Sequence, residues 1–175
     1  MSDYGRLVGP GEIEFIRQFD ADIERVWQFL VDPEKRKLWF CGGSTDNFVG
    51  GKIVFEFDHR RISDSPAPEK YADEEVVTHH AEILEYDPPR LLAFTWFESA
   101  GSESSKVRIT LSETGEGKTE LKLVHSGISG RDMLIGVLAG WHGHFDLLGE
   151  VLAGARISDF WIRDQQLEAE YSERV

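Results

Sequence analysis

The sequence predicts an α+β protein in which one antiparallel β-sheet is covered by a long C-terminal α-helix. Three observations support this prediction: a strand and two short helices open the chain, strand-like segments follow one another through its middle, and an apolar stripe at helical spacing runs near its end. Sequential strands joined by short turns form antiparallel sheets, and such a sheet has to bury one face. The final helix is the predicted element that is long enough to cover that face.

The N-terminal part predicts one strand followed by two short helices. Residues 12–19, EIEFIRQF, alternate apolar and polar side chains, which is the period of a strand. From residue 20 the apolar side chains recur every three or four positions, which predicts a helix with Asp20 or Asp22 as its N-cap. Pro33 then predicts the start of a second short helix over 33–40.

The middle of the chain has the features of successive strands. Its segments alternate in polarity or are rich in aromatic and β-branched residues, and they cover 50–60, 76–89, 90–98, 104–113 and 118–127. The link TGEGK between the last two predicts a tight hairpin turn. Residues 62–75, with two prolines and many charges, predict a loop beside an opening.

The predicted final helix contains several glycines. Its apolar stripe extends to Ala155, and Gly136 and Gly140 lie four residues apart on one side of it, with Gly143 close by. Each glycine costs roughly 1 kcal/mol relative to alanine in an exposed helix interior. We therefore expect these glycines to allow close approach to the sheet or to leave empty volume beneath the helix. The alternative is a kinked or interrupted helix near residues 140–143.

Composition limits the classes of function. A chain of 175 residues is long enough for one domain, and its formal net charge of −13 disfavours nucleic acid and anionic membranes as partners. The N-terminus does not resemble a signal peptide, and Cys41 is the single cysteine, which together favour a cytoplasmic location. We predict a flexible N-terminus over 1–11, a single domain over 12–165 and a C-terminal tail over 166–175.

The histidines are not arranged as a metal site. His142 and His144 lie two residues apart on the predicted helix and point away from one another, so we expect both in solvent or at a rim. His79 and His80 face opposite sides of a strand, and the alternation leaves open which of them faces inward. We predict no metal and no cofactor.

His125 and Cys41 are the remaining candidates for chemistry. His125 shares a strand face with Leu121 and Leu123, so we expect it to point inward, as a buried and hydrogen-bonded histidine rather than a catalytic one. Cys41 has no neighbouring residue in the sequence that would lower its pKa, so we expect a passive thiol.

Several motifs, taken in order, resemble those of a known family. They are Val26-Trp27 with Leu30, Asp32-Pro33-Glu34, Trp39-Phe40, Gly50-Gly51, His125-Ser126-Gly127, and Gly140-Trp141 with Phe145, Leu148 and Leu152. Over about residues 12–155 the chain is similar to the SRPBCC (START-like) superfamily, in the branch of the C-terminal domain of the activator of heat-shock protein 90 ATPase. The chain departs from that branch in the charged 62–75 loop and in His144-Phe145, which replaces the usual leucine and implies a more polar cavity floor.

The resemblance implies a helix-grip fold, in which a curved antiparallel sheet wraps around the C-terminal helix and leaves a cavity that holds apolar small molecules. We therefore predict non-catalytic binding of a lipid-like or polyketide-like ligand, with His125 or the indole N–H of Trp96 orienting a polar ligand group. The candidate lining residues are Trp39, Phe55, Phe57, Phe94, Trp96, Ile109, Leu123, His125, Met133, Trp141 and Phe145.

Two other functions stay open at this stage. The first is a chaperone-regulating module that binds a protein partner in a stress response, as the family name implies. The second is a cyclase or hydrolase acting inside the cavity, which an inward His125 with a nearby carboxylate would favour. The sequence leaves open whether the protein is a monomer or a homodimer.

Overall fold

The computed structural model describes residues 3–58, 61–69, 76–96, 105–155 and 158–175. Its strands are β1 (Arg6–Gly9), β2 (Glu12–Phe19), β3 (Gly42–Thr45), β4 (Lys52–Phe57), β5 (Val77–Asp87), β6 (Leu91–Trp96), β7 (Ser105–Gly115) and β8 (Lys118–Ser126). Its helices are α1 (Ile23–Val31), α2 (Pro33–Arg36), α4 (Arg131–Leu152) and α5 (Phe160–Ser172).

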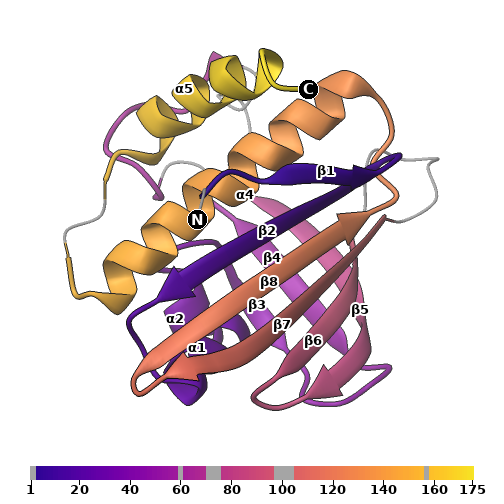
Figure 1. Ribbon diagram of the computed structural model, residues 1–175, viewed down its shortest axis with the longest axis vertical. Helices are drawn as coiled ribbons and strands as arrows, with labels where there is room; N and C mark the ends of the chain where they lie inside the picture. Colours follow the sequence, from indigo (N-terminus) through magenta and orange to yellow (C-terminus); the bar gives the residue numbers. More distant parts are fainter. Residues whose placement is uncertain (1–2, 59–60, 70–75, 97–104, 156–157) are drawn as a thin grey trace.

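The described strands form one antiparallel sheet in the order β1-β2-β8-β7-β6-β5-β4-β3, which curves around α4 (Figure 1). The predicted α+β helix-grip fold is confirmed.

The first predicted strand and the helices after it are present as β2, α1 and α2. Asp22 occupies the N-cap position of α1, and the Asp32 carboxylate caps α2 by accepting a hydrogen bond from the backbone N–H of Glu34 at 2.9 Å. α2 ends at Arg36, earlier than the predicted 33–40, because the chain turns there so that Trp39 and Phe40 enter the core.

The five strand-like segments of the middle form β4 to β8, and β7 and β8 are joined by the predicted tight turn. β1 and β3 are additional strands that the sequence did not predict. Each has four residues and lies at one edge of the sheet, where a strand needs no alternating apolar pattern because only one neighbour pairs with it. Of the predicted 62–75 loop, residues 62–68 contain neither helix nor strand, whereas 70–75 lie outside the described residues.

α4 is continuous over 22 residues, so its glycines do not interrupt it. Gly136 and Gly140 border open space, whereas Gly143 borders α5. A Cβ atom added at Gly136 or Gly140 would have no neighbouring heavy atom within 4 Å, whereas one added at Gly143 would lie 3.0 Å from Cε2 of Phe160. Gly143 therefore lets α5 pack closely on α4. The other two glycines leave empty volume, as the sequence predicted, but beside the helix and not beneath it.

The two chain ends pack on one another, which differs from the flexible N-terminus and C-terminal tail expected from the sequence. The backbone N–H of Gly5 donates to the hydroxyl of Tyr171 at 2.8 Å, and the hydroxyl of Tyr4 donates to Glu170 at 2.5 Å. α5 extends to Ser172, and its Tyr171 is only 1% exposed. The packed unit therefore includes residues on both sides of the predicted 12–165 domain, because α5 has apolar residues that fit against α4 at Gly143.

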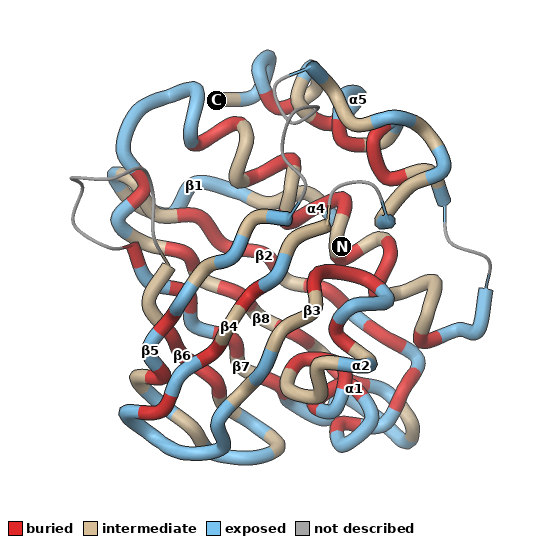
Figure 2. The backbone as a smooth tube through the Cα atoms, turned by 180° about the vertical axis from the view of Figure 1, so that it is seen from behind, coloured by how far each residue is buried: buried red, intermediate tan, exposed pale blue. Residues whose placement is uncertain are grey.

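The core lies between the concave face of the sheet and α4 (Figure 2). β2, β8 and α4 contribute side chains that are entirely buried, among them Phe15, Leu123 and Phe145. Arg36 is a buried cation at the β3 edge, where its guanidinium donates to the backbone carbonyls of Gly42 at 2.9 Å and Val54 at 3.1 Å. These bonds satisfy the guanidinium and hold the short β3 strand against the sheet.

Candidate functional site

The space between the sheet and the middle of α4 is filled by aromatic rings. Trp141 of α4 stacks on Phe40 with ring centroids 5.3 Å apart and on Phe145 at 5.5 Å. The void that remains next to Trp39 and Phe55 has a volume of about 20 Å³. Such a void holds one water molecule and no organic ligand.

A hollow with more room than this void lies at the mouth of the sheet, beside the first half of α4. A cavity of about 450 Å³ adjoins one of about 130 Å³, and the two share Phe40, Phe57, Gly136, Gly140, His144 and Glu168. We call the two together the α4 cleft. The larger part is completed by Trp96, Asp132, Met133, Val137 and Trp141. The smaller part is completed by Asp58, Ile62, Phe160, Trp161 and Asp164, so α5 forms one of its walls.

Gly136 and Gly140 provide the space for this cleft. They lie one turn apart on the side of α4 that faces the ends of β4 and β6, and no heavy atom lies within 4 Å of the position that a Cβ would take. A larger side chain at either position would occupy the cleft. The glycines noted in the sequence therefore shape the cleft beside α4 rather than a cavity beneath its centre.

The predicted lining residues are divided between the cleft and the packed core. The cleft is lined by Phe57, Trp96, Met133 and Trp141. The 20 Å³ void is bordered by Trp39, Phe55, Phe94 and Ile109. Leu123, His125 and Phe145 are fully buried and border neither.

Sequence reasoning missed Phe40 and Val137 as cleft residues, and it connected His144 with a cavity only through the family resemblance. Val137 and His144 follow from helical spacing, because they lie within one turn of Gly136 and Gly140 on the same side of α4. Phe40 had no comparable signal, since it lies in the turn after α2 and reaches the cleft only through the tertiary fold.

His144 holds a fixed position in the wall that both parts of the cleft share. Its Nδ1 lies 2.8 Å from the backbone carbonyl oxygen of Trp39. Its ring stacks on Phe160 with centroids 4.4 Å apart and meets Phe40 edge-on at 4.8 Å. The expectation that His144 lies at a rim is confirmed, since the residue is half-buried and lines the opening.

His125 points inward as predicted, and it is part of a buried chain of hydrogen bonds. The indole N–H of Trp141 donates to its Nδ1 at 3.1 Å, so the neutral ring carries its proton on Nε2. That N–H donates to the hydroxyl of Ser105 at 2.9 Å, which in turn donates to the carbonyl of Trp96 at 3.3 Å. Burial lowers the pKa of His125 to about 4. Both ring nitrogens are therefore engaged by the protein, and among the described residues no carboxylate bonds to this imidazole.

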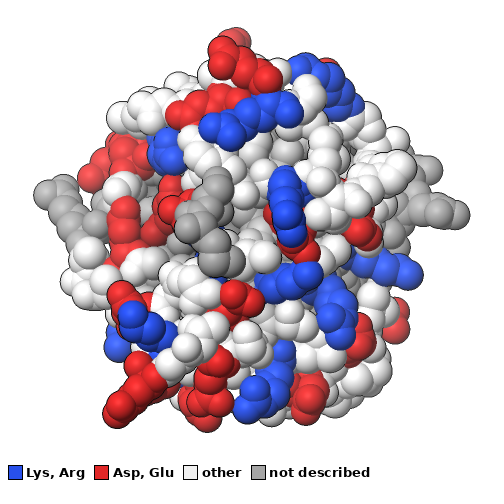
Figure 3. Space-filling view, viewed as in Figure 1, with Lys and Arg blue, Asp and Glu red and all other residues white. Residues whose placement is uncertain are grey.

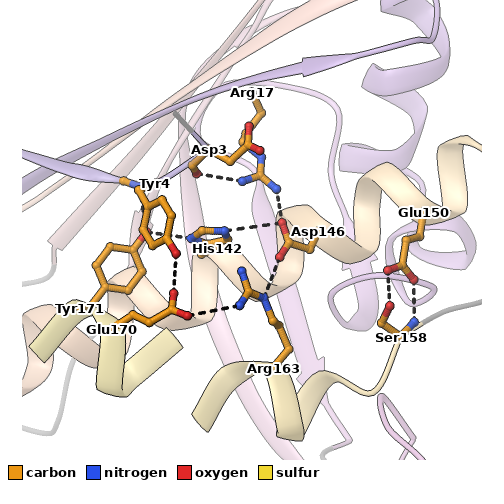
Figure 4. Close-up of polar contacts among 11 residues, drawn as sticks. Asp3, Tyr4, Arg17, His142, Asp146, Glu150, Ser158, Arg163, Glu170 and Tyr171 are labelled. Carbon is orange, nitrogen blue, oxygen red and sulfur yellow. Dashed lines mark hydrogen bonds and ion pairs between the residues drawn. The ribbon is translucent and has the colours of Figure 1, made fainter. Parts of the chain in front are cut away.

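His142 is buried, which corrects the expectation that it faces solvent. Figure 4 shows it within a polar cluster between α4, α5 and the N-terminal residues. Its Nδ1 lies 2.9 Å from the hydroxyl of Tyr171, and its Nε2 lies 3.7 Å from Asp146, which also pairs with Arg17 and Arg163. Burial lowers the pKa of His142 to about 4 and raises that of Tyr171. The sequence misplaced His142 because the later part of α5, including Tyr171, was expected to belong to a tail over 166–175.

The remaining candidate residues have structural surroundings. His79 is the inward member of its pair, with its ring 5.7 Å from Phe57, and His80 is exposed. Cys41 is 3% exposed, and desolvation by burial raises the pKa of its thiol to about 12, in line with a passive thiol. The described residues contain no group of three side chains placed to hold a metal ion.

The outer face of the sheet has mixed charge (Figure 3). Glu14 on β2, for example, pairs with both Lys122 and Arg6 at 2.5 Å, and these hydrogen bonds lower its pKa. None of the described helices has the length and apolar composition needed to cross a membrane.

A family model described as Activator of Hsp90 ATPase homolog 1-like protein matches residues 20–153, from the start of α1 to the end of α4. The chain belongs to this family. The resemblance inferred from the sequence motifs is thereby confirmed. β1, β2 and α5 lie outside the residues that the family model matches.

Solved structures from other organisms have the same fold. A protein from Bordetella parapertussis, determined by solution NMR, is 34% identical, with 99% of this chain and 91% of that chain covered and a TM-score of 0.83. CalU16 from Micromonospora echinospora is 25% identical over 97% of this chain and 93% of its own, with a TM-score of 0.67. A conserved protein of unknown function from Enterococcus faecalis shares the fold at 19% identity, 98% and 89% coverage and a TM-score of 0.69. No curated protein matches the chain.

Proposed function

We propose that this family member binds an apolar or amphipathic small molecule in the α4 cleft without changing it chemically. The observation that carries the proposal is the open volume of about 450 Å³ beside Gly136 and Gly140. Ligand sites in proteins commonly have volumes of about 300–1,000 Å³ and mainly apolar walls. Phe40, Phe57 and Trp96 provide such walls here.

The proposed site differs in position from the cavity first expected. Rings of Trp39, Phe40 and Phe145 occupy the centre of the fold, so a ligand fits at the mouth between α4, α5 and the ends of β4 and β6. Aromatic side chains there offer rigid contact area to a flat apolar molecule. Cys41, a buried thiol, also supports a reducing, cytoplasmic location.

Binding without catalysis is favoured over a cyclase or hydrolase by the surroundings of His125. A catalytic imidazole needs one nitrogen that can reach the reacting group. Here Trp141 and Ser105 occupy both nitrogens, and the side chain is fully buried. The family description supports a second candidate, a chaperone-regulating module that binds a protein partner.

The test combines native mass spectrometry with a variant that fills the cleft. Protein purified from its own host is expected to carry a small molecule, and a neutral fluorescent probe such as N-phenylnaphthylamine is expected to bind the emptied protein saturably. Gly140→Leu places an apolar side chain in the open volume and is expected to weaken probe binding at least about tenfold. Ala153→Leu, at an exposed position outside the cleft, is the matched control.

The two variants separate the candidate functions. Equal probe affinity in Gly140→Leu and the wild type, together with no co-purified mass, would contradict the small-molecule proposal. Stoichiometric binding to a purified chaperone, unchanged by Gly140→Leu, would instead support the protein-interaction candidate.

A further inference from the structure

The α4 cleft has a neighbouring pocket at the edge of the sheet. This pocket has a volume of about 510 Å³ and borders α2, β3 and β4. We call it the β3-edge pocket, and its lining residues include Glu34, Lys37, Leu38, Gly42, Glu56 and Arg61. Phe40, Asp58 and Ile62 line both this pocket and the smaller part of the α4 cleft. These three residues therefore form the wall between the two hollows.

Phe40 has the central position in this wall. Besides the β3-edge pocket, it lines both parts of the α4 cleft and the void of about 20 Å³ in the core. Asp58 and Ile62 do not line the larger part of the cleft. The direct route from the larger part of the cleft to the β3-edge pocket therefore leads through the space that the ring of Phe40 occupies.

Neighbouring side chains hold the ring of Phe40 in place. Trp141 stacks on it with ring centroids 5.3 Å apart and an interplanar angle of 22°. Phe57 and His144 meet it edge-on, at 5.1 Å and 4.8 Å. The backbone N–H of Phe40 donates to the carbonyl of Arg36 at 2.9 Å, which fixes the main chain of the turn after α2. Because the ring is buried among packed side chains, it closes the route in the folded protein.

The β3-edge pocket has apolar surface that suits the end of a long ligand. Leu38, Ile62 and Val76 line it together with charged side chains, among which Arg61 pairs with Asp58 at 2.8 Å. An alkyl chain that reached this pocket would bury further methylene groups against these apolar side chains. The ring of Phe40 stands between this surface and a ligand in the larger part of the cleft.

We propose that Phe40 limits the length of the ligand by separating the α4 cleft from the β3-edge pocket. This inference rests on the proposed function and specifies its ligand class, which is a compact apolar or amphipathic molecule that fits the cleft alone. Phe40 acts as a wall that determines ligand size, and no bond of the ligand is formed or broken.

The test measures how affinity depends on the length of an alkyl tail. Alkyl maltosides with tails of eight to fourteen carbon atoms, below their micelle concentrations, displace N-phenylnaphthylamine from the wild type and from Phe40→Leu. Each methylene group that enters an apolar site raises the affinity by up to about fourfold. Urea denaturation shows that each variant is folded.

The expected results differ between the two proteins. In the wild type, affinity should rise with tail length and then reach a plateau, where further methylene groups stay in water. In Phe40→Leu the plateau should lie at a longer tail, with a gain of at least about fourfold for the longest maltoside. The affinity for the shortest maltoside should change less than about twofold.

Two further variants make the test specific. Phe94→Leu makes the same change to a buried ring that lines the core void but neither of the two hollows, so the plateau should not move. A Cβ added at Gly42 would have its nearest heavy atom at 3.9 Å, so Gly42→Leu adds a side chain to the wall of the β3-edge pocket without a clash. Combined with Phe40→Leu, it should return the plateau to the wild-type tail length. Alone, it should change no affinity by more than about twofold.

The outcomes separate this inference from the proposed function. If the maltosides bind but the plateau is the same in the wild type and Phe40→Leu, or moves equally in Phe94→Leu, the role of Phe40 is wrong while the cleft remains a binding site. The same follows if wild-type affinity rises through the whole series without a plateau. A loss of affinity for the longest maltoside in Gly42→Leu alone would also overturn the role of Phe40, because the tail would already pass its ring. If neither N-phenylnaphthylamine nor any maltoside binds the wild type saturably, both proposals are overturned.

Discussion

The indole N–H of Trp141 and Nδ1 of His125 lie 3.1 Å apart and form a buried hydrogen bond between α4 and β8. The bond joins a residue of the Gly140-Trp141 motif to a residue of the His125-Ser126-Gly127 motif. It continues through Ser105 to the carbonyl of Trp96, the last residue of β6. One histidine thus fixes the helix to two parts of the sheet at the edge of the cleft.

Replacing His125 by phenylalanine should destabilise the fold. The substitution keeps the apolar ring but leaves the indole N–H of Trp141 without an acceptor in a buried site, with an expected loss of about 2–3 kcal/mol in the free energy of unfolding. Urea denaturation measures this loss. His80→Phe, on the exposed side of β5, is the control and should change stability by less than about 0.5 kcal/mol. Equal urea midpoints for His125→Phe and His80→Phe would contradict the stabilising role of the hydrogen bonds made by His125.

Stability should fall as the pH is lowered from 6.5 towards 4. His125 and His142 have a pKa of about 4 in the folded chain because burial disfavours their charged forms, against 6.5 as the unperturbed value. Between these values the unfolded state binds more protons, so the stabilisation is complete above pH 6.5 and is lost on acidification. Each histidine contributes a slope of up to about 1.4 kcal/mol per pH unit.

Urea denaturation at several pH values tests this dependence. His142→Gln cannot take up the proton and should show a shallower slope of stability against pH than the wild type. If the free energy of unfolding of the wild type does not change with pH over this interval, the fold does not lower the pKa of either histidine.

Replacing Gly136 or Gly143 of α4 by alanine should change the free energy of unfolding in opposite directions. Gly136→Ala adds a methyl group in open space and improves helix propensity, so it should raise the free energy of unfolding by up to about 1 kcal/mol. Gly143→Ala would place its Cβ 3.0 Å from Cε2 of Phe160, so this buried ring has to give way and the free energy of unfolding should fall by about 1 kcal/mol. Urea denaturation of both variants, at one pH, gives the comparison. A gain in stability for Gly143→Ala would contradict the close packing of α5.

Cys41 should not react with thiol reagents in the folded protein. Burial raises the pKa of its thiol to about 12, so almost none of it is thiolate at neutral pH, and the side chain is 3% exposed. Titration with a disulfide reagent should give no rapid reaction in buffer and one thiol per chain in denaturant. Rapid labelling of the native protein would show that the β3 edge opens.

The fold was predictable from the sequence where periodicity and burial agree. β2, α1 and the strands β4 to β8 each have an apolar pattern that matches the face they bury. β1 and β3 do not, because their order depends on pairing with one neighbour and, for β3, on the buried Arg36 that bonds its carbonyl groups. The sequence underestimated the extent and burial of α5. This burial depends on the packing of Phe160 and Leu167 against Gly143, which no local pattern in the sequence reveals.

The site was predictable only where the spacing of residues along α4 indicates which of them lie together. Gly136 and Gly140 indicated empty volume next to the final helix, expected beneath it and found beside it, and helical spacing from them leads to His144. The assumption that inward aromatic residues line a cavity was too broad, since Trp39 and Phe145 stack in the core and leave no room for a ligand. Whether an inward ring lines a cavity or fills it depends on how neighbouring rings pack, and that is a property of the tertiary structure.

The contact between the two chain ends has a practical consequence. Gly5 bonds to Tyr171, and the guanidinium of Arg174 lies 3.8 Å from the ring centre of Tyr4, so the first described residues pack against the end of α5. An affinity tag or fusion partner at either end would therefore have to leave this contact intact. A linker between the ends would give a ring-closed or circularly permuted chain that keeps every strand pairing intact.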